Sequence, residues 1–137
     1  MIPLILGIEV SIDTMETGAY LDATRNGHSE LFIGPWGTVT LDTDYVLYPM
    51  FHSSNVGAPG NRLFLKSDKV DELLTAARVE TDSDARLALY KEVQNQLAEE
   101  APAVYLYYSE LLVGVRDDLQ DFWQYPSSIF YLGDAHK

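Results

Sequence analysis

Apolar residues recur every three or four positions in the middle of the chain, which is the spacing of a helix that buries one face. Val70, Leu73, Leu74 and Ala77 keep this spacing after Ser67, a residue type that often caps helix N-termini. The pattern therefore predicts a helix that begins just after Ser67.

A second, longer helix is predicted to follow Thr81. Thr81 and Asp84 are spaced as a capping box, in which each side chain bonds the backbone N–H group of the other residue. Pro102 is expected to end this helix, because proline cannot continue the helical hydrogen bonds. The inner face of the helix is predicted to carry Leu89, Val93 and Leu97.

The first third of the chain predicts the order strand, helix, strand. Residues 7–13 alternate apolar and polar side chains, which is typical of a half-buried strand. Thr14 can cap a helix that Gly27 would end, and the short apolar run within residues 30–34 favours a second strand. Such a unit most often makes a parallel pair with a right-handed crossover.

Turn-forming residues mark two loops on either side of a short predicted helix. Residues 34–43 are punctuated by glycine and proline, and residues 53–62 are rich in serine, asparagine and glycine. Between them, residues 44–51 are predicted to be helical. The expected anchors of this helix are Tyr45, Leu47, Tyr48 and Phe51.

The C-terminal part is rich in β-branched and aromatic residues. Residues 103–108 and 111–116 are predicted to be strands on this basis. Residues 117–137 carry much apolar surface for a chain end, so this tail is expected to pack against the domain or against one outside the chain. Its large apolar residues are Phe122, Trp123, Tyr125, Ile129, Phe130 and Tyr131.

Composition narrows the possible functions. The 137 residues suffice for one domain, and a hydrophobic content of 47% argues against disorder of the whole chain. A formal net charge of -12 would repel a phosphate backbone, so no nucleic acid is expected as a partner. The lack of cysteine excludes thiol catalysis, disulfides and cysteine-ligated metals.

The apolar start of the chain, residues 1–8, ends at Glu9 and is too short to span a membrane. It lacks the basic start and the cleavage site of a complete signal peptide. A buried strand is the expected structure of this stretch.

Four stretches of sequence, taken in order and at their spacings, form a specific pattern. They are Gly7–Val10 with Gly18–Gly27, Trp36–Tyr45 with Leu47–Ser53, Gly60–Arg62 with Val70–Leu74, and Tyr90–Gln94 with Ala101–Tyr107. With this pattern the chain resembles the C-terminal part of the family 5 extracellular solute-binding proteins, the dipeptide-, oligopeptide- and glutathione-binding receptors of ABC importers. A complete member of that family is several-fold longer, so the resemblance implies a fragment.

The resemblance implies an α/β, periplasmic-binding-protein-like (type II) fold, in which two lobes close on a ligand around a hinge. Residues 1–116 would form most of the C-terminal α/β lobe, a mixed sheet flanked by helices. Residues 117–137 would be an aromatic-rich tail that leads back toward the missing N-terminal lobe of the same protein.

The implied function is transport without catalysis and without a cofactor. The receptor would capture a peptide or peptide-like small molecule between its lobes and deliver it to ABC permease subunits in the membrane. The implied location is periplasmic or extracellular, with membrane association through the importer and with any signal or lipoprotein segment outside this chain.

The loop after the second predicted strand is the main candidate for the ligand site, because ligands in open α/β sheets bind at the carboxyl ends of strands. Trp36 could stack on the ligand or fill the core, and the backbone N–H groups of Gly37 and Thr38 follow it. In peptide-binding relatives, an Asp shortly after this Trp is expected to pair with the ligand's amino group. Val39 stands at the aligned position here and cannot form that charge-assisted bond.

Asp42, Asp44 and Tyr45 extend this candidate site. The ligand's amine is left to Asp42, to Asp44 or to the missing lobe, or the ligand is not a simple peptide. Both acids could instead stabilise the start of the following helix, whose dipole favours negative charge at that end. As a pair of carboxylates they also raise the alternative of a glycosidase-like hydrolase.

Asn61 and Arg62 complete the candidate site. Arg62 could clamp a ligand carboxylate or anchor its own loop to a local acid, and Asn61 could satisfy the backbone of the turn. The three histidines, His28, His52 and His136, are dispersed, so no metal site is expected. The alternative to a transport role is a stand-alone, self-associating α/β interaction module, which the apolar tail favours.

Overall fold

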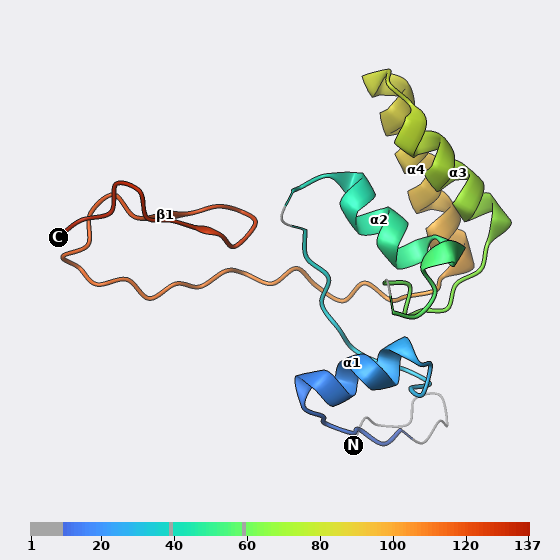
Figure 1. The fold of residues 1–137 in the computed structure, drawn as a ribbon, viewed down its shortest axis with the longest axis horizontal. Helices are drawn as coiled ribbons and strands as arrows, with labels where there is room; N and C mark the ends of the chain where they lie inside the picture. The colour runs from blue at the N-terminus through green and yellow to red at the C-terminus, as the bar shows by residue number, and fades with distance from the viewer. Residues whose placement is uncertain (1–9, 39, 59) are drawn as a thin grey trace.

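The computed structural model describes residues 10–38, 40–58 and 60–137 (Figure 1). Their secondary structure is mostly helical. The elements are α1 (Thr17–Arg25), α2 (Thr43–Phe51), the short 3-10 helix η1 (Ser53–Asn55), α3 (Asp68–Val79), α4 (Ser83–Glu100), β1 (Trp123–Gln124) and β2 (Phe130–Tyr131).

The hydrophobic core lies between α2, α3 and α4. The two long helices α3 and α4 lie side by side as a hairpin, and α2 packs across them (Figure 1). The predicted inner face of α3 is confirmed, and that of α4 is confirmed at Val93 and Leu97. The predicted Leu89 is only partly buried, and Tyr90 is buried in the core next to it. The buried core residues are Phe51, Val70, Leu73, Leu74, Ala77, Tyr90, Val93 and Leu97.

Of the two predicted helix caps, the one at α3 is confirmed and the one at α4 is wrong. Ser67 caps α3 as expected, and its Oγ accepts a hydrogen bond of 3.3 Å from the backbone N of Val70. The capping box of Thr81 and Asp84 is wrong, because α4 begins one residue later and Asp82 is its cap. The carboxylate of Asp82 accepts from the backbone N of Ala85 at 2.9 Å, a bond that a carboxylate forms at least as well as a hydroxyl.

Helix α1 begins at Thr17, later than the predicted start after Thr14, and no side chain caps it. Its end is as expected. Gly27 has a φ of 69°, the left-handed conformation that ends many helices and that glycine adopts without strain. Phe64 packs at this turn, because its ring would lie 3.1 Å from a Cβ on Gly27.

The predicted strand–helix–strand unit does not form. Within residues 10–13 and 30–34 the described chain contains no strand, and residues 7–9 of the first prediction lie outside the described residues. The apolar side chains Leu31 and Ile33 are exposed. A strand requires a neighbour for its backbone N–H and C=O groups, and the described chain brings none to these segments.

The predicted strands 103–108 and 111–116 are also wrong. These residues leave the end of α4 as a single extended run (Figure 1), without a strand partner in the part of the chain that the structure describes. Their large side chains face outward, and the exposed fractions reach 101% at Tyr108 and 89% at Leu112. The strand-forming composition is present, but the pairing that would use it is not.

The tail folds into a small hairpin. Strands β1 and β2 are antiparallel, with Trp123 opposite Tyr131 and Gln124 opposite Phe130. The rings of Trp123 and Tyr131 are 5.1 Å apart between centroids, so the aromatic tail packs partly on itself. An open groove of about 340 Å³ remains beside the hairpin, with Val113 and Phe130 among its apolar walls.

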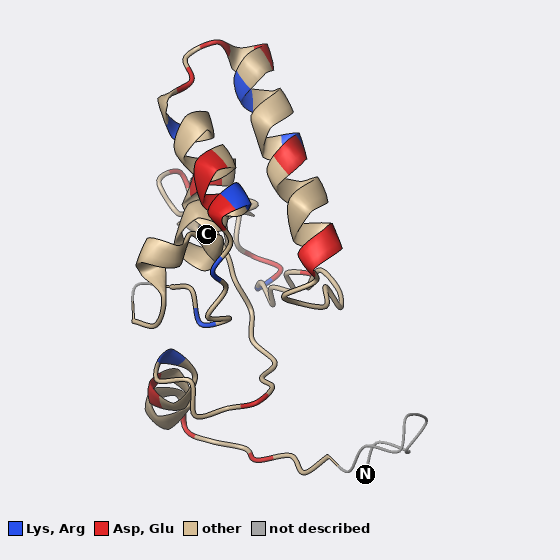
Figure 2. Cartoon of the chain, turned by 90° about the vertical axis from the view of Figure 1, so that its right-hand side faces the viewer, with Lys and Arg blue, Asp and Glu red and all other residues tan. Residues whose placement is uncertain are grey.

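The described residues therefore contain helices and strands, but the expected mixed sheet is replaced by one sheet of two short strands. Acidic residues occur on α1 and on both long helices (Figure 2), in keeping with the net charge of -12. None of the helices in the described ranges is long and apolar enough to cross a membrane.

Candidate functional site

The loop before α2 carries the first group of candidate residues. Trp36 is exposed, at 36%, and Gly37 beside it has open space on its side-chain face. The hydroxyl of Thr38 accepts from the backbone N of Leu41 at 3.1 Å, which closes the loop on itself. Val39, the position aligned with the acid of peptide-binding relatives, lies outside the described residues.

Asp42 begins α2 as its N-cap. Its Oδ1 accepts a hydrogen bond of 2.8 Å from the backbone N of Asp44, and it also lies 3.2 Å from Nη2 of Arg86 on α4. The interpretation of Asp42 as a helix cap is thus confirmed. The same carboxylate connects the candidate loop to the helical hairpin.

Asp44 is held by two residues from the helical hairpin. One carboxylate oxygen lies 3.3 Å from Nε of Arg78, and the other accepts from the hydroxyl of Tyr90 at 3.3 Å. Burial raises the pKa of Tyr90, and the nearby charge of Asp44 raises it further, while the hydrogen bond from Arg86 opposes the shift. Tyr90 therefore keeps its proton, and its hydroxyl donates a hydrogen bond to Asp44.

The roles of Arg78, Arg86 and Tyr90 could not be predicted from the sequence. These side chains lie more than 30 residues from the acids along the chain, and packing of α2 on the hairpin brings them together. One local signal was present, because Arg86 and Tyr90 are four residues apart and so share a helix face, where Nη2 donates to the Tyr90 hydroxyl at 3.2 Å.

Tyr45 lies in the first turn of α2, and its exposed fraction is 47%. Its prediction as an apolar anchor is wrong, because the helix turns Phe51 and not Tyr45 into the core. The exposed ring lies near the same end of α2 as the loop that carries Trp36 and Asp42, so these three candidates belong to one region of the chain.

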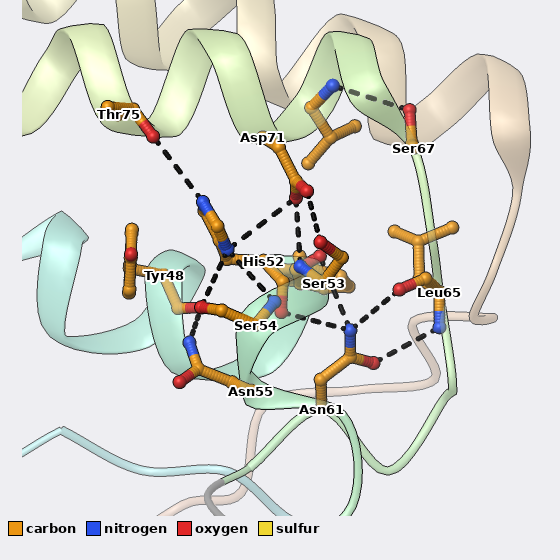
Figure 3. A network of polar contacts seen from close by, with 12 residues as sticks. Tyr48, His52, Ser53, Ser54, Asn55, Asn61, Leu65, Ser67, Asp71 and Thr75 are labelled. Carbon is orange, nitrogen blue, oxygen red and sulfur yellow. Dashed lines mark hydrogen bonds and ion pairs between the residues drawn. The ribbon is translucent and has the colours of Figure 1, made fainter.

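Asn61 is fully buried and organises the turn after η1 (Figure 3). Its Nδ2 donates to the carbonyl oxygen of Leu65 at 2.9 Å, and its Oδ1 accepts from the backbone N of Leu65 at 3.2 Å. The same amide also reaches the carbonyl oxygens of Phe51 and His52. The side chain therefore satisfies turn backbone, as one of the two sequence hypotheses expected.

Arg62 is half-buried, and its Nε has no hydrogen-bond partner among the described residues. Arg62 and Asn61 lie beyond the C-terminal end of α2, whereas the Trp36–Tyr45 group lies at its N-terminal end. The nine residues of α2 correspond to about 13 Å at 1.5 Å per residue. The structure thus divides the candidates into two groups and does not bring them into one cluster.

A second polar network connects η1 to α3 (Figure 3). Asp71 accepts from the backbone N of Ser53 at 2.8 Å and from the Ser53 hydroxyl. His52 places Nδ1 3.1 Å from the backbone N of Ser54, 2.9 Å from its hydroxyl and 3.7 Å from Asp71. A catalytic triad needs the serine and the acid on opposite ring nitrogens. Here both use Nδ1, so the group is not a triad.

In the described ranges, no group of three or more His, Cys, Asp or Glu side chains is arranged to hold a metal ion.

Comparison with known proteins places these features in a wider context. No family model matches the chain. It is 28% identical over 117 residues to the "Probable D,D-dipeptide-binding periplasmic protein DdpA" of Escherichia coli K12. The aligned region covers 85% of this chain and 23% of that protein. The chain is 29% identical over 136 residues to the "Glutathione-binding protein GsiB" of Salmonella choleraesuis, over 95% of this chain and 27% of that protein.

The glutathione-binding protein of Salmonella paratyphi A is 30% identical over the same shares. The chain thus spans about a quarter of the length of the curated relatives that it matches. The resemblance drawn from the four sequence stretches is thereby confirmed: over most of its length, this chain is homologous to a part of the family 5 periplasmic solute-binding proteins.

Proposed function

We propose that this chain is part of the solute-binding receptor of an ABC importer, that it contributes one wall of the ligand cleft, and that it does so without catalysis. Relatives named for binding a D,D-dipeptide and glutathione support a peptide or peptide-like ligand. The receptor acts in the periplasm, or outside the cell, and hands its ligand to permease subunits in the membrane.

The proposal rests on the exposure of aromatic side chains in the Trp36–Tyr45 region. The loop before α2 presents the exposed ring of Trp36 and the open backbone of Gly37, and the first turn of α2 presents the exposed ring of Tyr45. Exposed aromatic side chains on a rigid support give a ligand apolar contact area at a small entropic cost. A peptide-sized solute would lie against these rings.

Asp42 and Asp44 each form an ion pair within the chain, so their negative charges are partly balanced before a ligand arrives. Asp42 is occupied by its helix and by Arg86, and Asp44 by Arg78 and Tyr90. Because both acids are paired, we expect the second lobe to bind the ligand's ammonium group. The alternative is a ligand that has no ammonium group next to this loop. The same pairing disfavours a hydrolase built on the two acids, because neither is positioned as a free acid or base.

The second lobe completes the cleft. Residues 1–116 form this lobe, and residues 117–137 lead toward the other one. The extended run of residues 103–116 supports this arrangement, because its outward apolar side chains and unpaired backbone are suited to packing and strand pairing with further chain. Asn61 and Arg62 belong to the proposed site through their turn, with Asn61 acting by holding its shape.

Calorimetric titration of the complete two-lobed protein with dipeptides and glutathione tests the proposal. Replacing Trp36→Ala should weaken binding by about tenfold or more, which is typical of losing a central aromatic contact. The matched control is Trp123→Ala, a tryptophan on the tail hairpin that is also exposed, at 45%, which should leave the affinity unchanged. Equal affinities for both variants would refute a ligand site at Trp36.

A self-associating module remains the second candidate, and the exposed run of residues 103–109 favours it. This run has no charged residue and combines strand-forming side chains, a composition that pairs readily with a second copy. Light scattering on the isolated chain distinguishes the two roles. A dimer that Leu106→Lys converts to monomer supports association, whereas a strict monomer at all concentrations removes it.

A further inference from the structure

The ring of His52 lies at the junction of α2, η1 and α3 (Figure 3). Tyr48 of α2 covers it, with ring centroids 4.4 Å apart, and Thr75 and Asp71 of α3 face its two nitrogens. The side chain is 14% exposed, so a change in its charge would be felt by these neighbours more than by solvent. No step in the proposed function uses this residue.

The hydrogen bonds fix which ring nitrogen carries the proton. Nδ1 accepts from the backbone N of Ser54 at 3.1 Å, which requires an unprotonated nitrogen, and this bond makes His52 the N-cap of η1. The proton of the neutral ring is therefore on Nε2, which lies 3.4 Å from Oγ1 of Thr75. In this state His52 acts as Asn or Asp would at a helix start.

Protonation changes what Nδ1 can do. A protonated Nδ1 is a donor and can no longer accept from the backbone N of Ser54. Its possible acceptors are then the Ser54 hydroxyl oxygen, 2.9 Å away, and the negatively charged Asp71, whose Oδ1 lies 3.7 Å away. The other charged group near the ring is Arg78, whose guanidinium lies 4.0 Å from the centroid of the Tyr48 ring. Asp71 would attract the imidazolium, whereas Arg78 contacts the ring of Tyr48, which in turn packs on His52.

We propose that His52 is a pH-responsive latch on the turn from η1 to Asn61: on protonation, its ring gives up the cap of η1 and forms an ion pair with Asp71. Backbone hydrogen bonds connect the start of η1 at His52 to the turn that ends at Asn61. The backbone N of Asn55 donates to the carbonyl oxygen of His52 at 3.0 Å, and the backbone N of Asn61 donates to Asn55 at 2.9 Å. Loss of the cap would therefore loosen the segment that holds Arg62.

Nitrogen-15 NMR of the 137-residue chain between about pH 8 and pH 5, the range in which histidine side chains take up a proton, tests this latch. At high pH, Nδ1 of His52 should resonate as an unprotonated acceptor. As the ring gains its proton, the amide of Ser54 should shift with the same midpoint. Its hydrogen exchange, corrected for the intrinsic effect of pH, should quicken by about fivefold to tenfold, as expected for one lost hydrogen bond.

Three variants separate the latch from a general effect of acid. His52→Asn keeps a side-chain cap that does not titrate, so the Ser54 amide should stay protected at both ends of the pH range. Asp71→Asn removes the negatively charged partner of the imidazolium, so the response of the Ser54 amide to acid should differ from that of the unmodified chain. His136→Asn, at an exposed histidine of the tail, should leave the response of Ser54 intact.

A Ser54 amide in the unmodified chain that does not follow the titration of His52 would overturn the proposal, and so would an unchanged pH response in His52→Asn. Because the first of these measurements needs no variant, the test does not depend on whether the substituted chains fold.

Discussion

Nη2 of Arg86 lies 3.2 Å from Oδ1 of Asp42, so a residue in the first turns of α4 holds the carboxylate that begins α2. The same guanidinium donates through Nε to the carbonyl oxygen of Ala77 at the end of α3. One side chain thus joins the candidate ligand loop to both helices of the hairpin. The loop's position depends on this contact as well as on the helix that it precedes.

Two replacements of Asp42 separate its roles as cap and as ion-pair partner. Asp42→Ala removes both, and we expect the free energy of unfolding to fall by about 1 kcal/mol from loss of the cap. Asp42→Asn keeps a capping oxygen and loses only the charge, so the loss should be smaller. Urea denaturation measures both. Equal losses for the two variants would mean that the cap contributes nothing.

Replacement of Asn61 should have a larger effect on stability. Asn61→Ala leaves the part-buried N–H and C=O groups of Leu65 without their side-chain partners, at a cost of about 1 kcal/mol for each unpaired group. The matched control is Asn26→Ala, an exposed residue whose amide bonds only the carbonyl of Asp22, for which we expect about 0.5 kcal/mol or less. Similar midpoints of denaturation for both variants would contradict the structural role of Asn61.

The packing of α3 on α4 makes a third prediction. Leu74 is fully buried, and Leu74→Ala should lower the free energy of unfolding by about 2–5 kcal/mol through lost contacts and a residual cavity. Leu87, on the outer face of α4, is 69% exposed, and Leu87→Ala should change stability by about 0.5 kcal/mol or less. Thermal and urea denaturation compare the pair. If Leu87→Ala costs as much as Leu74→Ala, the hairpin packs differently in solution.

Tyr90 makes a prediction about high pH. Burial and the charge of Asp44 raise its pKa in the folded chain above the value of about 10 for an unfolded tyrosine. The folded state therefore holds the phenolic proton more tightly, so this contribution to stability is complete below about pH 10 and is lost as the pH rises through the folded pKa. Tyr90→Phe should flatten the fall in stability above about pH 10. Curves that remain parallel for the two proteins would contradict this.

The helical hairpin could be predicted because its information is local. Val70, Leu74, Val93 and Leu97 repeat at the helical period, and Ser67 caps the first helix in sequence as it does in space. The predicted strands were wrong, because a strand such as residues 103–108 forms only with a partner elsewhere in a chain. Its composition predicts pairing but does not provide a neighbour.

For the candidate residues, the sequence indicated local structural roles better than contacts between distant segments. Asp42 could be identified as a cap or a ligand contact from its place before a helix. Its pairing with Arg86, and that of Asp44 with Arg78, arise from contacts between distant segments that no periodicity reveals. Asn61, a polar residue in a turn, gave no sequence signal that it would be fully buried.

The central claim is that Trp36 and its neighbours form one wall of a cleft that a second lobe completes. Its most direct test is calorimetric titration of this 137-residue chain and of the two-lobed protein with the same dipeptides and glutathione. We expect micromolar or tighter binding by the two-lobed protein and no heat of binding by the isolated chain up to millimolar ligand. Equal affinity in the isolated chain would contradict the claim.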